Sequence, residues 1–290
     1  MKEDINDNEI RLIGVDDKNT HKEHKRWIWI VSAAIVIVVG VVLAIYLPRK
    51  TVVTGVEDTN EYGYDEANVL HPLKSWLYSY DDCQESGCAI KDTTVNDIDI
   101  RIYLPLNAVP ALEVGLRPLL DNNVILAFQA ADVRADNGKI VGAFVEKGKP
   151  IAWGLSKKGY CAILRGKIYV GVADNSPLFE EATDCKGYFF RQYPLVKRYV
   201  PQENELKTQS IRRALCEVDG HIVCVETKIR TGMHDFAVLL ADLGVVNAIY
   251  LTGSDSMGTV TDLEGNRTQI GNLVEKPYKY TNFIYWTKQK

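Results

Sequence analysis

The chain carries two different hydrophobic patterns. Residues 27–47 (WIWIVSAAIVIVVGVVLAIYL) form one uncharged apolar stretch, whereas from about residue 94 short apolar runs alternate with polar residues and glycine-containing turns. At 1.5 Å of rise per residue, a helix over the apolar stretch would be roughly 31 Å long, enough to cross a hydrocarbon core of about 30 Å. The pattern therefore predicts one N-terminal transmembrane helix, Trp27 to Leu47, in contact with the lipid bilayer.

Positive charges flank this stretch unequally. Five lysines and arginines lie within about 20 residues before it, but only Arg49 and Lys50 follow it closely. Because positive flanks stay in the cytoplasm, residues 1–26 are predicted to be a cytoplasmic tail and residues 48–290 to be periplasmic or extracellular. The tail is polar, mixed in charge and without apolar periodicity, so it is predicted to be disordered. A cleaved signal peptide would have a shorter apolar run that ends in small residues. The better prediction is an uncleaved signal-anchor in a single-pass membrane protein.

Strand patterns fill the exported part. Residues 48–93 are predicted to be a tether and N-terminal segment, and residues 94–290 one domain. An Asp219–Gly220 turn predicts a hairpin, and apolar residues at helical spacing before Gly244 predict a helix. Many strands with one clear helix indicate an α+β fold, a single mixed-sheet domain with packed helices. The predicted strands are 98–104, 124–128, 139–145, 167–172, the hairpin 214–226 and 245–251, and the predicted helix is 235–243.

Composition narrows the class of function. The chain is 46% hydrophobic and 25% charged, as folded proteins are, with a net charge of −4. A nucleic-acid binder would normally present a basic face, so no nucleic-acid partner is expected. The sequence also lacks a P-loop, a dinucleotide fingerprint and a Gly-x-Ser-x-Gly nucleophile motif.

All six cysteines lie after the apolar stretch. An even number in an exported region suits an oxidising compartment and disulfide pairing. Zinc is the alternative, but no CxxC pair occurs and only three histidines are exported, so no metal site is predicted. No cofactor is predicted either, with a divalent cation left open. The predicted disulfides are Cys83–Cys88, Cys161–Cys185 and Cys216–Cys224.

The third pair depends on the hairpin register. A three-residue loop centred on Gly220 would place Cys216 opposite Cys224. A two-residue loop, Asp219–Gly220, would instead put the two side chains on opposite faces of the hairpin.

Five short motifs follow one another in an order that resembles a known family. In that order they resemble the phosphodiester glycosidase family, the relatives of N-acetylglucosamine-1-phosphodiester α-N-acetylglucosaminidase. The resemblance covers about residues 95–262. The motifs are FQAAD (128–132), GAFV (142–145), RRALC (212–216), LGV (243–245) and NAIYLTGSDS (247–256).

The resemblance implies a hydrolase that acts on a glycosyl phosphodiester or a related envelope glycan. Four departures bear on this activity, since Thr252 stands at the family's aspartate, Gln129 at its asparagine, Arg213 at its threonine and Gly253-Ser254-Asp255 at its glycine run. A threonine hydroxyl does not ionise near neutral pH and cannot replace a catalytic carboxylate. Either Asp132 or Asp255 has taken over, or the domain is a non-catalytic sugar-phosphate-binding or envelope-scaffolding descendant.

The candidate site residues come from these motifs and their neighbours. Asp132 and Asp255 are the candidate catalytic carboxylates, and the Arg212 guanidinium is the candidate ligand of a phosphodiester oxygen. The structural alternatives are an ordinary polar turn at 252–256, ion pairs of the two adjacent arginines, a packed Arg191, and a helix start at His234. The substrate-binding candidates are Gln129, Arg191, Arg212, Arg213, His234, Thr252, Gly253, Ser254 and Ser256, with a glycan or sugar phosphate as the expected ligand.

The membrane topology can be tested by deletion. The full chain is expected in the membrane pellet after carbonate extraction, because residues 27–47 are long enough to span a bilayer. A deletion of residues 1–47 is expected in the soluble fraction, while a deletion of residues 1–26 alone, the matched control, is expected to stay in the pellet. Full-length protein in the soluble fraction would contradict the prediction.

Overall fold

The computed structural model describes residues 69–204, 207–254, 256–272 and 276–289. The expected cytoplasmic tail, the expected membrane segment 27–47 and most of the tether lie outside these described residues. Within them, no helix combines the length and the apolar character needed to cross a membrane. The description below concerns the unit that contains them, Tyr62–Lys290.

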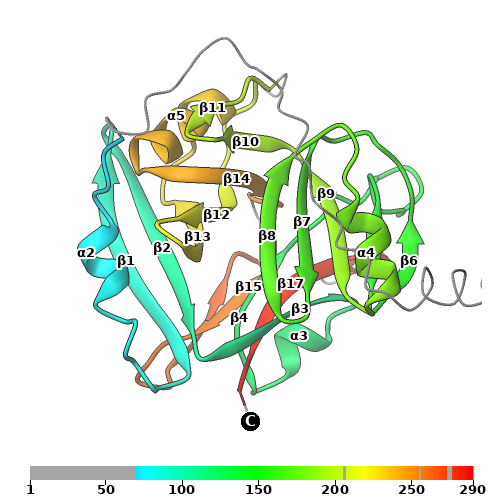
Figure 1. Cartoon of the computed structure of the whole chain (residues 1–290), viewed down its shortest axis with the longest axis horizontal. Coiled ribbons are helices and arrows are strands. Elements are labelled where there is room, and N and C mark those ends of the chain that lie inside the picture. Colours follow the sequence, from blue (N-terminus) through cyan, green and yellow to red (C-terminus); the bar gives the residue numbers. More distant parts are fainter. Residues whose placement is uncertain (1–68, 205–206, 255, 273–275, 290) are drawn as a thin grey trace, which may run out of the picture. The chain divides into compact units, whose positions relative to one another are not determined.

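The architecture is mostly β, and the expected α+β fold with one mixed sheet is wrong (Figure 1). The strands form three sheets in which every strand pair is antiparallel. Parallel neighbours need a crossover, usually a helix, and among the described residues only α5 exceeds seven residues. The helices are α2 (Lys74–Tyr78), α3 (Arg117–Leu120), α4 (Leu178–Asp184) and α5 (Met233–Asp242).

The first sheet, called sheet 1 here, contains most of the RRALC motif (212–216) and the first half of the NAIYLTGSDS motif (247–256). Its strand order is β1 (Gly87–Val95), β2 (Ile98–Leu106), β13 (His221–Thr227), β12 (Arg213–Val218), β14 (Val245–Leu251), β10 (Pro194–Lys197) and β11 (Val200–Pro201).

Two further five-stranded sheets complete the fold. Sheet 2 has the order β16 (Arg267–Ile270), β15 (Gly258–Thr261), β4 (Val124–Gln129), β17 (Asn282–Lys288) and β3 (Ala108–Val114). Sheet 3 has the order β6 (Lys149–Ala152), β5 (Phe144–Glu146), β9 (Tyr188–Gln192), β7 (Gly159–Leu164) and β8 (Lys167–Val172).

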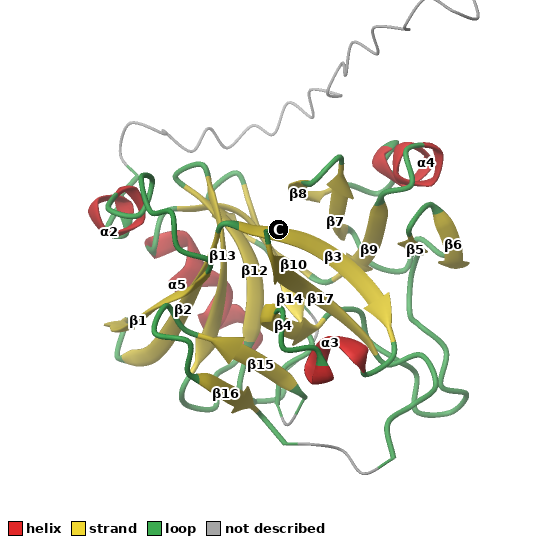
Figure 2. Ribbon diagram, turned by 90° about the horizontal axis from the view of Figure 1, so that it is seen from below, coloured by secondary structure: helices red, strands yellow, loops and turns green. Residues whose placement is uncertain are grey.

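Two apolar cores lie on the two faces of sheet 1. One face packs on α2 and α5, which lie beside this sheet in Figure 2. The other face shares a central core with sheets 2 and 3. This core contains Leu251 from sheet 1, Phe128 from sheet 2 and Phe190 from sheet 3. Burial of aromatic side chains of this size supplies much of the apolar free energy of a core. The three sheets are therefore held together by one shared core.

The hairpin of β12 and β13 decides one of the disulfide predictions. Asp219 and Gly220 both have positive φ, 48° and 78°, and Val218 pairs with His221, so the loop has two residues. Cys216 then lies in the core beneath α5, and Cys224 lies in the central core on the opposite face. This is the register in which no Cys216–Cys224 bond forms.

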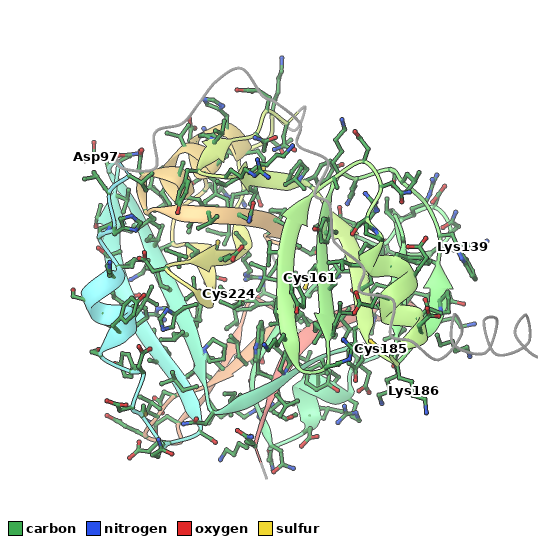
Figure 3. All side chains as sticks on the ribbon, in the orientation of Figure 1. Asp97, Lys139, Cys161, Cys185, Lys186 and Cys224 are labelled. Carbon is green, nitrogen blue, oxygen red and sulfur yellow. The ribbon has the colours of Figure 1, made fainter. Side chains whose placement is uncertain are left out.

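The other two disulfide predictions are wrong as well, because all six cysteines are free. Cys83 packs against the core beneath α2, whereas Cys88 lies in the central core. Cys161 lies within β7 and faces the central core, while Cys185 follows α4 on the other side of sheet 3 (Figure 3). Each predicted pair is thus divided by a sheet.

Thiol labelling tests this arrangement. In denaturant without reductant, all six thiols are expected to react. In the folded protein only the part-exposed Cys83 and Cys185 are expected to react quickly, because burial raises the pKa of Cys88, Cys161 and Cys216 well above its ordinary value. Mass spectrometry after iodoacetamide labelling counts both sets. Fewer than six labels in denaturant would reveal a disulfide.

Candidate functional site

One strand from each sheet ends at the same place. β4 ends at Gln129, β9 at Gln192 and β14 at Leu251. Directly beyond these ends, the Thr252 amide donates to the Gln129 carbonyl at 3.1 Å, and Gln192 Nε2 donates to the Ala130 carbonyl at 3.2 Å. The segment 130–132 therefore lies where all three sheets meet.

A carboxylate, Asp132, stands at this junction. Its Oδ1 accepts hydrogen bonds from Gln192 Nε2 at 3.0 Å and from Thr252 Oγ1 at 3.1 Å, and its Oδ2 is paired with Lys157 Nζ. The Asp132 side chain is 30% exposed. Three donors thus fix the orientation of the carboxylate, while part of it still faces solvent.

The ammonium opposite this carboxylate is buried. The Lys157 side chain is only 3% exposed, and its Nζ also donates to Gln192 Oε1 at 2.6 Å. The Nζ atom lies 4.2 Å from the centre of the Tyr193 ring. Burial lowers the pKa of Lys157, and the attraction of Asp132 opposes that shift.

Lys157 was not among the residues predicted from the sequence. It occupies the loop between β6 and β7, directly before Lys158, whose side chain is 64% exposed and pairs with Asp174 at 2.9 Å. Nothing in the local sequence separates the buried lysine from the exposed one. Gln192 was missed for the same reason, because its role depends on a contact 60 residues away along the chain.

The backbone beneath Asp132 is fixed by the last strand. Asn282, at the start of β17, is fully buried. Its Oδ1 accepts from the Ala131 amide at 2.8 Å, its Nδ2 donates to the Ala131 carbonyl at 3.1 Å, and its own carbonyl accepts from the Ala130 amide at 3.1 Å. These bonds satisfy buried backbone groups that no sheet ladder reaches.

The loop after β14 is shaped by Arg213 and Ser256. Arg213 Nη1 donates to the Ser256 carbonyl at 2.9 Å and bonds its hydroxyl, while Arg213 Nε pairs with Glu226. Ser256 Oγ in turn donates to the Thr252 carbonyl. Gly253 is required here, since a Cβ would lie 2.3 Å from the Ile211 carbonyl oxygen. The side chains of Arg213 and Ser256 therefore hold the Thr252 loop in place.

Ser254 and Asp255 are two other predicted site residues that follow β14 in the sequence. Ser254 is exposed, with φ of 55°, and its amide donates to the Ile211 carbonyl at 2.8 Å. Asp255, a candidate catalytic carboxylate, lies outside the described residues.

Arg212 faces away from Arg213, as alternation along a strand requires. Its Nε donates to the Thr231 carbonyl at 3.0 Å and its Nη2 to the Thr208 carbonyl. The guanidinium is 5.8 Å from the Tyr250 ring centre, and the residue is 3% exposed. In this structure Arg212 joins two loops, and no hydrogen bond of the described residues links its side chain to Asp132.

Arg191 is a packed arginine at the base of the Lys157 loop. Its Nη1 donates to the carbonyls of Lys157 at 2.6 Å and Ala173 at 3.0 Å, and its Nη2 to that of Asp174 at 3.0 Å. Burial lowers the pKa of Arg191. The residue is 2% exposed, so it positions Lys157 through the backbone.

His234 and Gln129 complete the predicted set. The His234 side chain, in the first turn of α5, is 57% exposed and has Nδ1 3.1 Å from Glu203 Oε1. Among the described residues, no hydrogen bond joins it to the Asp132 group. Gln129 is half-buried at the end of β4, and its carbonyl accepts the Thr252 amide.

The junction has no metal-binding cluster among the described residues, and it lies outside two surface hollows. Across the described parts of the chain, no three His, Cys, Asp or Glu side chains are grouped to hold a metal ion. Two surface hollows of about 410 and 360 Å³ lie along β3 and the β7–β8 turn, and Asp132 lines neither of them. The junction is a candidate site because of the contacts of Asp132 with Lys157, Gln192 and Thr252.

Comparison with known proteins finds similarity of fold only. No protein-family model matches the sequence, and no curated protein matches it significantly. The catalytic domain of zebrafish N-acetylglucosamine-1-phosphodiester α-N-acetylglucosaminidase, auto-inhibited by its pro-peptide, is similar with a TM-score of 0.48 and 14% identity, over 71% of this chain and 83% of that one.

Two further solved structures have comparable similarity. A hypothetical protein from Synechocystis has a TM-score of 0.49 and 11% identity, over 70% of this chain and 62% of that one. An exported protein from Burkholderia pseudomallei has a TM-score of 0.46 and 9% identity, over 66% of this chain and 74% of that one. At identities this low, the chemistry of the site is argued from the side chains of this chain.

The ion pair predicts an asymmetric effect on stability. Asp132→Ala leaves the Lys157 ammonium buried without its counter-ion and is expected to lower the free energy of unfolding by about 2–3 kcal/mol, less than for a fully buried pair because Asp132 is 30% exposed. Lys157→Met removes the buried charge itself, so a loss below about 1 kcal/mol is expected. Urea denaturation measures both.

The matched control is Asp136→Ala. Asp136 pairs with Arg134 at 2.8 Å in a solvent-exposed position on the same loop. No measurable change in stability is expected for it. Equal losses for the Asp132 and Lys157 variants would contradict the asymmetry.

Proposed function

We propose that this domain hydrolyses a glycosyl phosphodiester or a related envelope glycan, with Asp132 as the acid–base group. The observation that carries the proposal is the part-exposed Asp132 carboxylate, held by Lys157, Gln192 and Thr252 where three strands end. The five motifs between residues 128 and 256, which resemble those of phosphodiester glycosidases, support a glycosyl phosphodiester as the class of substrate. The unequal charges around residues 27–47 support an exported, membrane-tethered location.

The reaction needs only one ionised carboxylate in the described site. Asp132 accepts a proton from water, whose oxygen attacks the anomeric carbon of the sugar. The bond from that carbon to the phosphate oxygen breaks, and its electron pair leaves with the phosphomonoester. Because a phosphomonoester has its second pKa near 6, it departs as an anion without a proton donor. Asp132 then releases its proton to solvent.

A second candidate function is non-catalytic binding of a sugar phosphate or scaffolding of the envelope. Thr252, which stands at the family's aspartate, shares its one hydroxyl proton between Asp132 Oδ1 and the Ala130 carbonyl oxygen. Arg212 and Arg213 are engaged by protein oxygens. These contacts favour a junction that has kept its architecture and lost its reaction.

Turnover separates the two candidates. The full chain is incubated with the methyl and phenyl esters of N-acetylglucosamine 1-phosphate, and released sugar is measured. Hydrolysis is expected, and Asp132→Asn should slow it by about 10²–10⁴-fold, since an amide cannot take the proton. Asp136→Asn, on the same loop, should retain the rate.

Restoring the family residues tests the alternative. If the chain is inactive but Gln129→Asn with Thr252→Asp hydrolyses the esters, the second candidate is correct. Activity that persists in Asp132→Asn would exclude Asp132 as the acid–base group.

A further inference from the structure

The loop that carries Lys157 also carries two exposed apolar side chains. Trp153 is 70% exposed and Leu155 is 65% exposed, among the most exposed large apolar residues of the described chain. Exposed apolar residues that stand alone need no explanation, whereas exposed apolar side chains that are grouped together are typical of ligand-binding grooves. The pair lies between β6 and the buried Lys157.

Hydrogen bonds hold this loop at both ends of the pair. The Gly154 carbonyl accepts from the Ala143 amide at 3.0 Å, and the Lys157 carbonyl accepts from Arg191 Nη1 at 2.6 Å. Gly154 has φ of 145°, and a Cβ built on it would approach Gly142 Cα to 3.6 Å. Trp153 and Leu155 are therefore presented by a fixed backbone.

This backbone packs on the turn that carries the carboxylate. The Asp132 carbonyl accepts from the Val141 amide at 2.9 Å, and Ala143, two residues later, bonds Gly154. From the other end of the loop, Lys157 reaches Asp132 itself. The loop that carries the two apolar side chains is thus tied to the Asp132 turn, through the backbone on one side and through the Lys157 ion pair on the other.

The Thr252 loop, which also contacts the carboxylate, carries polar side chains. Thr252 bonds Asp132, and the exposed Ser254 follows it after β14 of sheet 1. The described backbone amides of this loop are bonded within the protein, so the exposed Ser254 side chain is the group that suits a sugar, which is rich in hydrogen-bonding groups. Beyond Trp153 and Leu155, the exposed Lys158 is neutralised by Asp174. Trp153 and Leu155 therefore present an apolar surface next to an ion pair whose charges neutralise each other.

We infer that Trp153 and Leu155 bind an apolar alcohol esterified to the phosphate of the substrate. This inference rests on the proposed function, because it assigns the second half of the same phosphodiester. The sugar lies toward Thr252, the scissile bond lies at Asp132, and the alcohol lies over Trp153 and Leu155. The substrate class is then an amphiphilic sugar phosphodiester, aryl or alkyl.

Binding of three esters tests this assignment. The full chain is placed in lipid nanodiscs, and the dissociation constants of the methyl, hexyl and phenyl esters of N-acetylglucosamine 1-phosphate are measured by calorimetry, with empty nanodiscs as the blank. The hexyl or phenyl ester is expected to bind about tenfold more tightly than the methyl ester. Preference for phenyl alone would identify an aryl alcohol, and equal preference a general apolar one.

The variant Trp153→Ala with Leu155→Ser should reduce that preference to within about twofold and leave methyl-ester binding unchanged. Leu120→Ala is the matched control, because Leu120 is 77% exposed at the end of α3, outside the site. It should retain the preference. An unchanged preference in the double variant, or none in the natural sequence, overturns the inference.

Hydrolysis measured in parallel keeps the two proposals apart. If the chain binds the hexyl or phenyl ester more tightly than the methyl ester but hydrolyses none of them, the proposed reaction is wrong and the apolar contact is supported. Hydrolysis of all three esters at equal rates and affinities overturns the apolar contact and leaves the reaction standing. Failure to bind any ester overturns both.

Discussion

The pairing of a buried ammonium with a part-exposed carboxylate constrains the rest of this structure. Lys157 can stay charged at 3% exposure only if acceptors surround it, and Asp132 and Gln192 supply them. Holding those acceptors in place requires the ends of β4, β9 and β14 to meet. The junction of the three sheets and the chemistry of the site are therefore one arrangement.

Two buried arginines, Arg191 and Arg213, stabilise this arrangement without contacting Asp132. Arg191 fixes the carbonyl of Lys157, and Arg213 fixes the loop that delivers Thr252 to Asp132. Each guanidinium spreads several donors over backbone carbonyls, which a lysine cannot do in the same geometry. Buried arginines near a site are thus not evidence of anion binding by themselves, since their donors can be spent on the protein.

Local patterns predicted the elements well. Lys167–Val172 and Val245–Leu251 match β8 and β14, and the Asp219–Gly220 turn lies where the sequence puts it. The strand predicted over 139–145 is mostly a loop, with only Phe144–Glu146 in β5. Apolar residues there are buried by packing between the sheets, which alternation cannot distinguish from strand burial.

Long-range features were harder to predict. The direction of strand pairing and the face on which each cysteine falls depend on connections across the fold, so the mixed sheet and the disulfides were wrong. Three residues selected from the sequence motifs, Gln129, Asp132 and Thr252, do lie next to one another in the structure. The motifs could not reveal Lys157 or Gln192, whose significance arises only from tertiary burial.

The position of Asn282 has a consequence for biosynthesis. This side chain belongs to the final strand, yet it secures the backbone at Ala130 and Ala131, roughly half a chain earlier. A ribosome releases the N-terminal part first, so a nascent chain lacks the anchor for its own carboxylate until residue 282 has been synthesised. The site can form only after that point, and a stop codon shortly before residue 282 would leave most of the described strands encoded but the junction unformed.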